Sequence, residues 1–182
     1  YVFPDTWLLI QDSIMAVDKQ VNFSSYRYLM VIHAGNGQET SGVSSDIWSI
    51  TYISGITFRT NDNWSFSSAA IAPETEAQGA VPLGVYCHEF SHLLGLPDLY
   101  IYGSSSRPVG NWDLMDRGCW NGNPPGSSPA HYIAWGKIKL KWINESQVLT
   151  VPIGSRVNVT IDPIEAPSKN YQVLKIPVST NR

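Results

Sequence analysis

Hydrophobic positions near the start of the chain follow two different periods. From Trp7 to Val17 they recur every three or four residues, which predicts an amphipathic helix with one apolar stripe made of Trp7, Ile10, Ile14 and Val17. Residues 28–32 form an uninterrupted apolar run of strand length, so we expect a buried strand there.

β-Branched and aromatic residues mark further strands. The stretch 47–59 is interrupted at Ser54 and Gly55, and it predicts one or two strands. Residues 67–72 predict another strand, which ends before Pro73.

A second helix is predicted over residues 82–94. Tyr86, Phe90 and Leu93 stand at positions i, i+4 and i+7, so we expect these three side chains to face the core. The polar residues of the same helix would then face a cleft.

The last third of the chain changes its pattern. Residues 130–142 keep a helical period and predict a second long helix. Apolar and polar residues then alternate at 148–151 and 156–161, between prolines and a glycine, which predicts strands. We therefore expect one domain over residues 1–143 and, over 144–182, a β-rich extension or the start of a truncated second domain.

The predicted helix at 82–94 carries the most informative chemistry of the chain. His88 and His92 are four residues apart, so both imidazoles point to one position beside the helix. Glu89 lies one step further round, where it can reach a metal-bound water without binding the metal. This is the arrangement of two ligands and a base found in zinc metallopeptidases.

The residues that follow predict a third ligand. Gly95 suits a left-handed helix end, and Pro97 prevents the helix from resuming. The turn would bring the Asp98 carboxylate back to the histidines and leave a fourth position open for water, as in catalytic zinc sites. Met115 lies in a polar turn further on and could form a hydrophobic floor beneath the metal.

These motifs resemble the immune inhibitor A family of secreted metallopeptidases, which are similar to metzincins. The resemblance covers about residues 26–143. It rests on the zinc motif at 88–98 and the methionine segment at 110–116, and on flanking segments at 33–40, 45–49, 129–132 and 134–137.

The resemblance implies an α+β, metzincin-like zincin fold: a twisted mixed β-sheet, a backing helix and an active-site helix, followed here by the C-terminal β-rich segment. It also implies that the strand at 67–72 forms the upper rim of the cleft and pairs with extended substrate. The chain departs from the metzincin pattern twice: Asp98 stands where a histidine is usual, and no tyrosine closely follows Met115.

Composition restricts the partners of the domain. A net charge of -3 and a pI near 5.7 give no reason to expect nucleic acid binding. No apolar run approaches the length of a membrane span, and no signal peptide is recognisable.

Because the chain begins at Tyr1, we expect a piece of a longer protein with flanking domains or a propeptide. Glycosylation sequons begin at Asn22, Asn63, Asn144 and Asn158, which suits a secreted or cell-surface protein.

Two cysteines leave two possibilities open. Cys87 precedes a ligand candidate and Cys119 follows the methionine turn, so a disulfide between them is one expectation in an oxidising compartment. The other is that both are small buried hydrophobic residues.

Other polar residues also have two interpretations. Asp98 could stabilise a turn or bind calcium, while His33 is expected to be a loop histidine. His131 could begin a helix or reach the cleft, where it or a tyrosine could assist the oxyanion. Further calcium ligands could come from Glu39, Asp46, Asp113 and Asp116, although none has the spacing of a calcium loop.

The sequence therefore predicts a secreted zinc endopeptidase that hydrolyses proteins or peptides. His88, His92 and Asp98 would bind Zn²⁺, and Glu89 would assist the attack of a zinc-bound water. Two alternatives remain: a non-enzymatic, metal-stabilised module of a larger surface protein, and a zinc amidase acting on non-peptide bonds. An intact Glu89 argues against the first, because a purely structural metal site needs no base.

Overall fold

The computed structural model describes residues 5–178, and these form two compact units, Tyr1–Ala130 and His131–Arg182. The predicted division after residue 143 concerns where the catalytic domain ends and stays a prediction.

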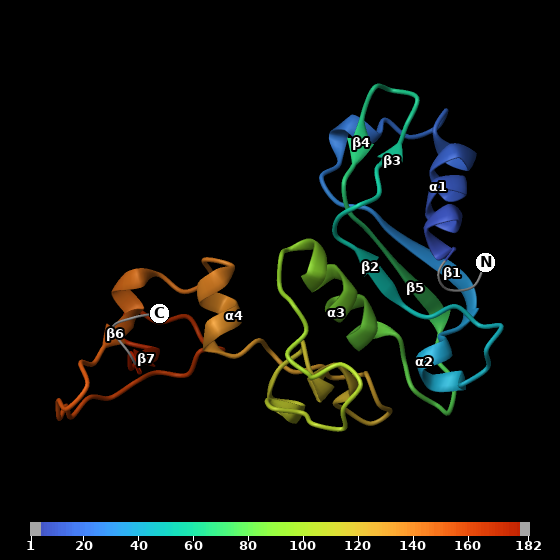
Figure 1. Ribbon diagram of the computed structural model, residues 1–182. Helices are drawn as coiled ribbons and strands as arrows, with labels where there is room; N and C mark the ends of the chain where they lie inside the picture. Colours follow the sequence, from blue (N-terminus) through green and yellow to red (C-terminus); the bar gives the residue numbers. More distant parts are fainter. Residues whose placement is uncertain (1–4, 179–182) are drawn as a thin grey trace. The chain divides into compact units, whose positions relative to one another are not determined.

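A three-stranded mixed sheet organises the first unit (Figure 1). Its order is β1 (Met30–Asn36), β5 (Ala69–Thr75) and β2 (Ile50–Tyr52). β1 runs parallel to β5, with Val31 opposite Ile71, and β2 runs antiparallel to it. Strands are therefore present where they were predicted, but their order along the sheet was not foreseen. The expectation of a buried strand at 28–32 was wrong, because β1 is only partly buried and Ile32 is 46% exposed.

The position of β5 corrects one expectation. Residues 67–72 were expected at the rim of the cleft, yet β5 is the central strand and pairs with a neighbour on both sides. An extended substrate cannot hydrogen-bond to a strand whose two edges are occupied. The edge strand that contacts the helix at residues 83–93 is β2.

Helices α1 (Thr6–Val17) and α3 (Leu83–Leu93) lie on opposite faces of this sheet (Figure 1). The face toward α1 contributes alternate residues of β5, including Ile71, to the hydrophobic core. That core contains Ile10, Ile14, Phe23, Phe58, Phe66, Ala69 and Ile71. On the other face, small alanines of β5 allow α3 to pack closely.

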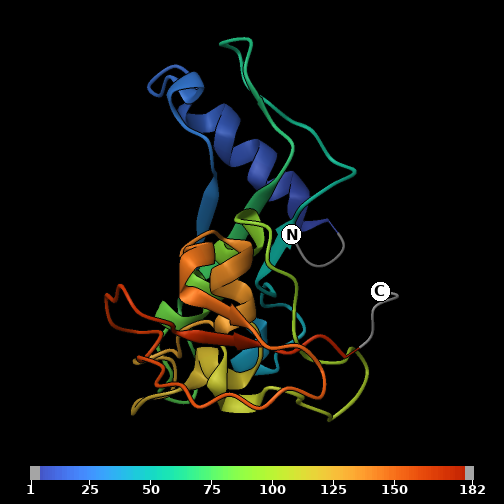
Figure 2. The ribbon, with the colours of Figure 1, turned by 90° about the vertical axis from the view of Figure 1, so that its left-hand side faces the viewer.

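Short elements complete the first unit. Strands β3 (Phe58–Arg59) and β4 (Ser65–Phe66) form a hairpin whose loop projects past the end of α1 (Figure 2). The remaining short helices are η1 (Phe23–Ser25), α2 (Gln38–Ser41), η2 (Gly110–Trp112) and η3 (Arg117–Trp120).

Close packing of α3 against η3 requires a glycine at position 84. A Cβ built on Gly84 would lie only 1.8 Å from the carbonyl oxygen of Cys119. Any larger residue would push the helix away from the segment that follows Met115.

The orientation of α3 differs from the prediction. Phe90 is exposed and forms an edge contact with Tyr28, while His88 and Glu89 are buried. Leu93 is buried as predicted, and Tyr86 is only partly buried. The apolar stripe of Tyr86, Phe90 and Leu93 was expected to face the core. Instead, neighbouring segments bury the polar face that carries His88 and Glu89.

The second unit contains α4 (Ala134–Lys139), η4 (Glu145–Gln147) and two parallel strands, β6 (Val148–Thr150) and β7 (Val173–Lys175). Buried Lys137 donates a hydrogen bond of 2.5 Å to the carbonyl oxygen of Ile164. This bond satisfies a charged group that would otherwise be costly to bury.

Two predictions for this unit were wrong in extent. The helix expected over 130–142 spans six residues, because Ile133 is extended and Lys141 adopts a left-handed φ of 60° that ends it. Residues 156–161 alternate but form no strand, and Val157 and Ile161 are each 47% exposed. Alternation alone does not make a strand where no neighbour is available for pairing. None of the helices within residues 5–178 has the length and apolar character needed to span a membrane.

Candidate active site

Helix α3 presents the histidine pair as the sequence predicts. It begins after Pro82 and ends at Leu94, and Gly95 then takes a left-handed φ of 95°. Because His88 and His92 are one turn apart, their ring centroids are only 4.9 Å from each other.

Backbone carbonyls orient both imidazoles. Nδ1 of His88 lies 2.9 Å from the carbonyl oxygen of Leu114, and Nδ1 of His92 lies 2.8 Å from that of Leu96. Each Nδ1 therefore donates its hydrogen to a carbonyl, which directs Nε2 and its lone pair toward the space beside the helix. Such bonds determine the tautomer of metal-binding histidines.

Asp98 brings its carboxylate to the same place. Its Oδ1 lies 2.9 Å from Nε2 of His88 and 3.4 Å from Nε2 of His92. Ligands about 2.0 Å from a tetrahedral zinc ion are separated by about 3.3 Å. The two distances are within about 0.4 Å of that spacing, so these three atoms suit a zinc ion.

Electrostatics at this point also favour a cation. Burial by itself would lower the pKa of His88, but Asp98 and Cys119 raise it well above its usual range. Burial would raise the pKa of Asp98, but the two histidines and Tyr102 lower it well below its usual range. One buried oxygen facing two Nε2 atoms thus requires positive charge, which a proton or a metal ion can supply.

Glu89 belongs to the same cluster of side chains as the two histidines. Its carboxylate and the two histidine nitrogens are within 4.8 Å of one another. Burial raises the pKa of Glu89, while His88 and Thr51 oppose that change. The Thr51 hydroxyl donates to Oε2 of Glu89 over 2.7 Å.

The methionine segment contacts the site mainly through its backbone. Met115 is 1% exposed, and its carbonyl oxygen accepts a 2.8 Å bond from the N–H of Leu99, next to Asp98. Its own N–H donates to Oδ1 of Asp113 over 2.6 Å. Leu114, one residue earlier, provides the carbonyl that orients His88. This turn therefore holds two ligand candidates in place.

A cavity of about 560 Å³ opens over His88 and Glu89. The Tyr100 ring stacks on the His88 imidazole, with centroids 6.4 Å apart, and the guanidinium carbon of Arg107 lies 5.3 Å from the centroid of the Tyr100 ring. The cavity is lined by Glu39, Trp48, Ser49, Val85, His88, Glu89, Tyr100, Ser105, Arg107, Asp116, Arg117, Cys119 and Trp120. A peptide-sized cleft thus borders the candidate metal position and the candidate base.

Comparison with known proteins identifies the family. Residues 24–145 match the model of the immune inhibitor A peptidase M6 catalytic domain. The chain belongs to this family. It is therefore a metallopeptidase, as the motifs predicted.

Two curated proteins are similar to this M6 peptidase. Pre-pro-metalloprotease PrtV of Vibrio cholerae serotype O1 is 32% identical over 143 residues, covering 66% of this chain and 15% of the relative. Immune inhibitor A of Bacillus thuringiensis subsp. alesti is 36% identical over 118 residues, covering 58% and 17%. The chain thus spans about one sixth of the length of these relatives.

The family implies a metal, typically zinc, and the structure offers one place for it. Within residues 5–178, His88, Glu89 and His92 are the one cluster of at least three potential metal-binding side chains. Calcium finds no such support: Asp113 and Asp116 use their carboxylates to bind backbone N–H groups.

The remaining acidic and histidine candidates are not part of the cluster of His88, Glu89 and His92, although Glu39 lines the cavity. Glu39 accepts hydrogen bonds from Ser49, and Asp46 is outside the cavity lining. His33 was expected to be a loop histidine but is buried on β1, where its Nδ1 contacts the carbonyl oxygen of Ala34 and its Nε2 has no hydrogen-bond partner among residues 5–178. His131 lies in the second unit.

The cysteines of the M6 domain are free thiols, so the expected disulfide is wrong. The backbone of Cys119 packs against Gly84, and its Sγ donates to the carbonyl oxygen of Asp116 over 3.3 Å. Burial raises the pKa of the Cys87 thiol. The alternative interpretation, two small residues within the packing of the site, fits these contacts.

Sequence reasoning missed three side chains of the site. Tyr102 donates a hydrogen bond to Asp98, and its own pKa is raised to about 12 by burial and by that carboxylate. Tyr100 covers His88, and burial together with the Asp98 charge raises its pKa. Both tyrosines follow Asp98 closely in the sequence, and this proximity could have indicated that they lie at the site. Thr51 is distant in sequence from the zinc motif, so no sequence pattern could have indicated its contact with Glu89.

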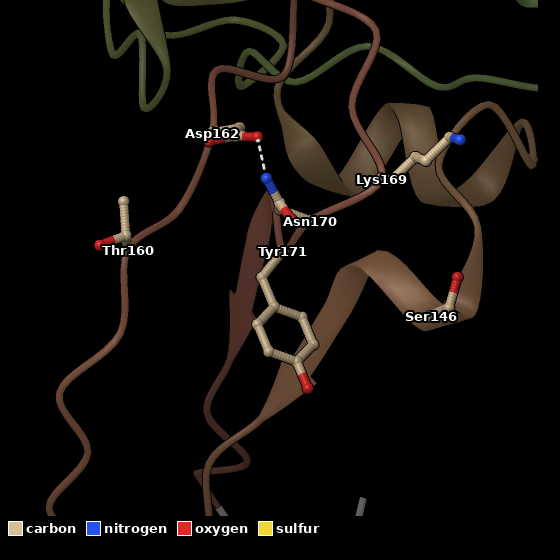
Figure 3. A pocket seen from close by; sticks show the side chains of 6 residues that line it. All are labelled: Ser146, Thr160, Asp162, Lys169, Asn170 and Tyr171. Atoms are coloured by element: carbon tan, nitrogen blue, oxygen red, sulfur yellow. Dashed lines mark hydrogen bonds between the residues drawn. The ribbon is translucent and has the colours of Figure 1, made fainter.

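A second cavity, of about 530 Å³, lies in the second unit (Figure 3). It is lined by Ser146, Thr160, Asp162, Lys169, Asn170 and Tyr171. Its carboxylate, on Asp162, accepts hydrogen bonds from Ser168 and Asn170, which lower its pKa. No histidine or cysteine lines this pocket, so it lacks the kind of metal-binding cluster that lies on α3.

Proposed function

We propose that this domain is a zinc-dependent endopeptidase in which His88, His92 and Asp98 bind the metal and Glu89 is the general base. The observation that carries the proposal is the convergence of both Nε2 atoms on Oδ1 of Asp98, at 2.9 and 3.4 Å. Family membership favours a peptidase over a non-enzymatic module or an amidase acting on other bonds.

The protein groups account for the proton movements of peptide hydrolysis. Zn²⁺ held here would lower the pKa of water and polarise the scissile carbonyl. Glu89 takes one proton from the water whose oxygen attacks the carbonyl carbon. It then gives that proton to the amide nitrogen as the C–N bond breaks, leaving a carboxyl group and an amine. A pKa raised by burial suits a group that must both accept and release a proton.

A metzincin-like substrate arrangement is part of the proposal. β2 has an open edge beside α3 and runs antiparallel to β5. We assign α1 as the backing helix, α3 as the active-site helix and β2 as the strand that pairs with an extended peptide. Backbone pairing of this kind gives affinity with little sequence preference.

We also propose that the domain is secreted as part of a longer precursor. Its match to about one sixth of each relative's length, the "pre-pro" in the name of one relative and the four sequons support this. Mass spectrometry of the culture medium and of cell fractions would locate the protein and define its mature ends. Finding it only in the cytosol would contradict the proposal.

Glu89→Gln tests the mechanism. Glutamine keeps the size and can accept the Thr51 hydrogen bond, but it cannot take a proton. We expect casein cleavage to fall by more than about 10²-fold with zinc content unchanged. Exposed Glu165→Gln is the matched control and should cleave as the wild type does. Comparable cleavage by the Glu89→Gln variant would remove Glu89 as the base.

A further inference from the structure

Thr51 on strand β2 is tied to the proposed base by two contacts. Its Oγ1 lies 2.7 Å from Oε2 of Glu89 and 2.9 Å from the carbonyl oxygen of the same residue. Glu89 is 7% exposed, so few other partners are available to its carboxylate. One hydroxyl therefore reaches both the side chain and the backbone of Glu89.

Strand geometry explains why position 51 makes these contacts. Ile50 and Tyr52 pack against the hydrophobic core on the α1 side of the sheet. Successive side chains of a strand point to opposite faces, so Thr51 faces α3. Its antiparallel pairing with Ala70 of the central strand holds its backbone in register. The hydroxyl is thus held by the sheet and not by a mobile loop.

The two contacts suit both protonation states of a general base. A hydroxyl has one hydrogen to donate and two lone pairs. When Glu89 is ionised, Thr51 donates to Oε2. When Glu89 holds the proton taken from water, that proton lies on Oε1, and Thr51 can still donate to Oε2 or to the backbone carbonyl oxygen of Glu89. In either state Oε2 stays beside Thr51, which leaves Oε1 to face the reacting water.

We propose that Thr51 is a positioning residue that keeps the Glu89 carboxylate aimed at the reacting water throughout the proton transfers. The inference rests on the proposed function of Glu89 as the base. It assigns a part of the catalytic machinery to the same strand that offers its open edge to substrate. Thr51 itself touches neither the metal nor the reacting atoms.

Two substitutions separate the hydroxyl from the shape of the side chain. Thr51→Val is nearly isosteric and lacks the hydroxyl, while Thr51→Ser keeps it. We expect Thr51→Val to lower kcat about 10- to 100-fold, as for loss of a hydrogen bond to a charged group or misplacement of a reacting group, with KM changed less than about threefold. Thr51→Ser should restore kcat to within about threefold of the wild type.

Controls distinguish positioning from a structural role. Zinc content, zinc affinity and Tm of Thr51→Val should match those of the wild type. Thr150→Val, an exposed strand position in the second unit, measures the effect of the same change away from the site. A kcat for Thr51→Val within threefold of the wild type would overturn the inference. So would a joint loss of zinc, Tm and activity that serine does not restore.

The result is separable from that for Glu89. If Glu89→Gln remains active, the proposed mechanism fails whatever Thr51 does. If Glu89→Gln is inactive and Thr51→Val is fully active, the mechanism stands and only the positioning role is lost.

Discussion

Glu76 is a buried carboxyl group whose replacement should change how stability depends on pH. It is 8% exposed and lies just after β5, where its Oε2 accepts a hydrogen bond from Thr40 of α2. Its Oε1 is buried without a hydrogen-bond partner among the described residues. The Glu39 carboxylate lies close by, since a Cβ built on Gly37 would be 2.8 Å from Oε1 of Glu39 and 2.9 Å from Oε2 of Glu76.

These surroundings raise the pKa of Glu76 from 4.5 to about 7, mainly through burial and also through the Glu39 charge, against the Thr40 hydrogen bond. The folded protein therefore holds this proton more tightly than the unfolded chain does. Stability from this group is fully present below about pH 4.5 and is lost as pH rises through about 7. Without solvent screening, this pKa difference would correspond to a contribution of about 3 kcal/mol to the free energy of unfolding. Screening by solvent reduces the expected contribution to about 1–2 kcal/mol.

Glu76→Gln imitates the protonated form at every pH. Between pH 5 and pH 8 the free energy of unfolding of the variant, relative to the wild type, should rise by about 1–2 kcal/mol. Urea unfolding at four pH values measures this, and comparing the two proteins at each pH cancels metal-dependent terms. Exposed Glu165→Gln should give a difference that does not vary with pH. A constant difference for Glu76→Gln as well would refute the reasoning.

The other predictions concern the metal and the packing beneath it. In zinc titrations Asp98→Ala should weaken binding at least tenfold and His88→Ala should abolish it, and unchanged affinity for Asp98→Ala would place the third ligand elsewhere. Tyr102→Phe should weaken binding about 10- to 100-fold by freeing the Asp98 carboxylate, whereas equal affinity would make that hydrogen bond dispensable. Gly84→Ala should lower the free energy of unfolding by about 3 kcal/mol, because its Cβ would meet the Cys119 carbonyl, and an unchanged Tm would contradict this.

Local patterns in the sequence were sufficient for the histidine pair and the turn after it. The spacing of His88 and His92 is a property of one helix, and Gly95 ends that helix as predicted. Helix α1 was likewise predicted from its own periodicity, and the structure places Ile10 and Ile14 in the core. In each case the deciding interactions join residues within a few positions of one another.

Longer-range features could not be derived in the same way. The place of β5 at the centre of the sheet depends on pairing with β1 and β2, which no local period encodes. The orientation of α3 depends on Gly84 and on the segment that packs against it. A hydrophobic stripe predicts the buried face of a helix only where the polar face is exposed to solvent. On α3 the polar face is buried by other segments of the chain.

This difference between local and long-range interactions explains why the sequence motif identifies the candidate site residues but not the groups that orient them. His88 is oriented by Leu114 in the methionine segment, His92 by Leu96 in the turn after α3, and Glu89 by Thr51 on β2. These three partners come from segments that meet only when the sheet, the helix and the turn have packed together. A metal ion bound by the proposed ligands would therefore stabilise the folded arrangement over the unfolded chain, as any ligand specific to the native state does. Chelation should accordingly lower the Tm of the wild type and leave that of His88→Ala unchanged. An equal fall in both proteins would mean that the chelated metal stabilises the fold from some other place.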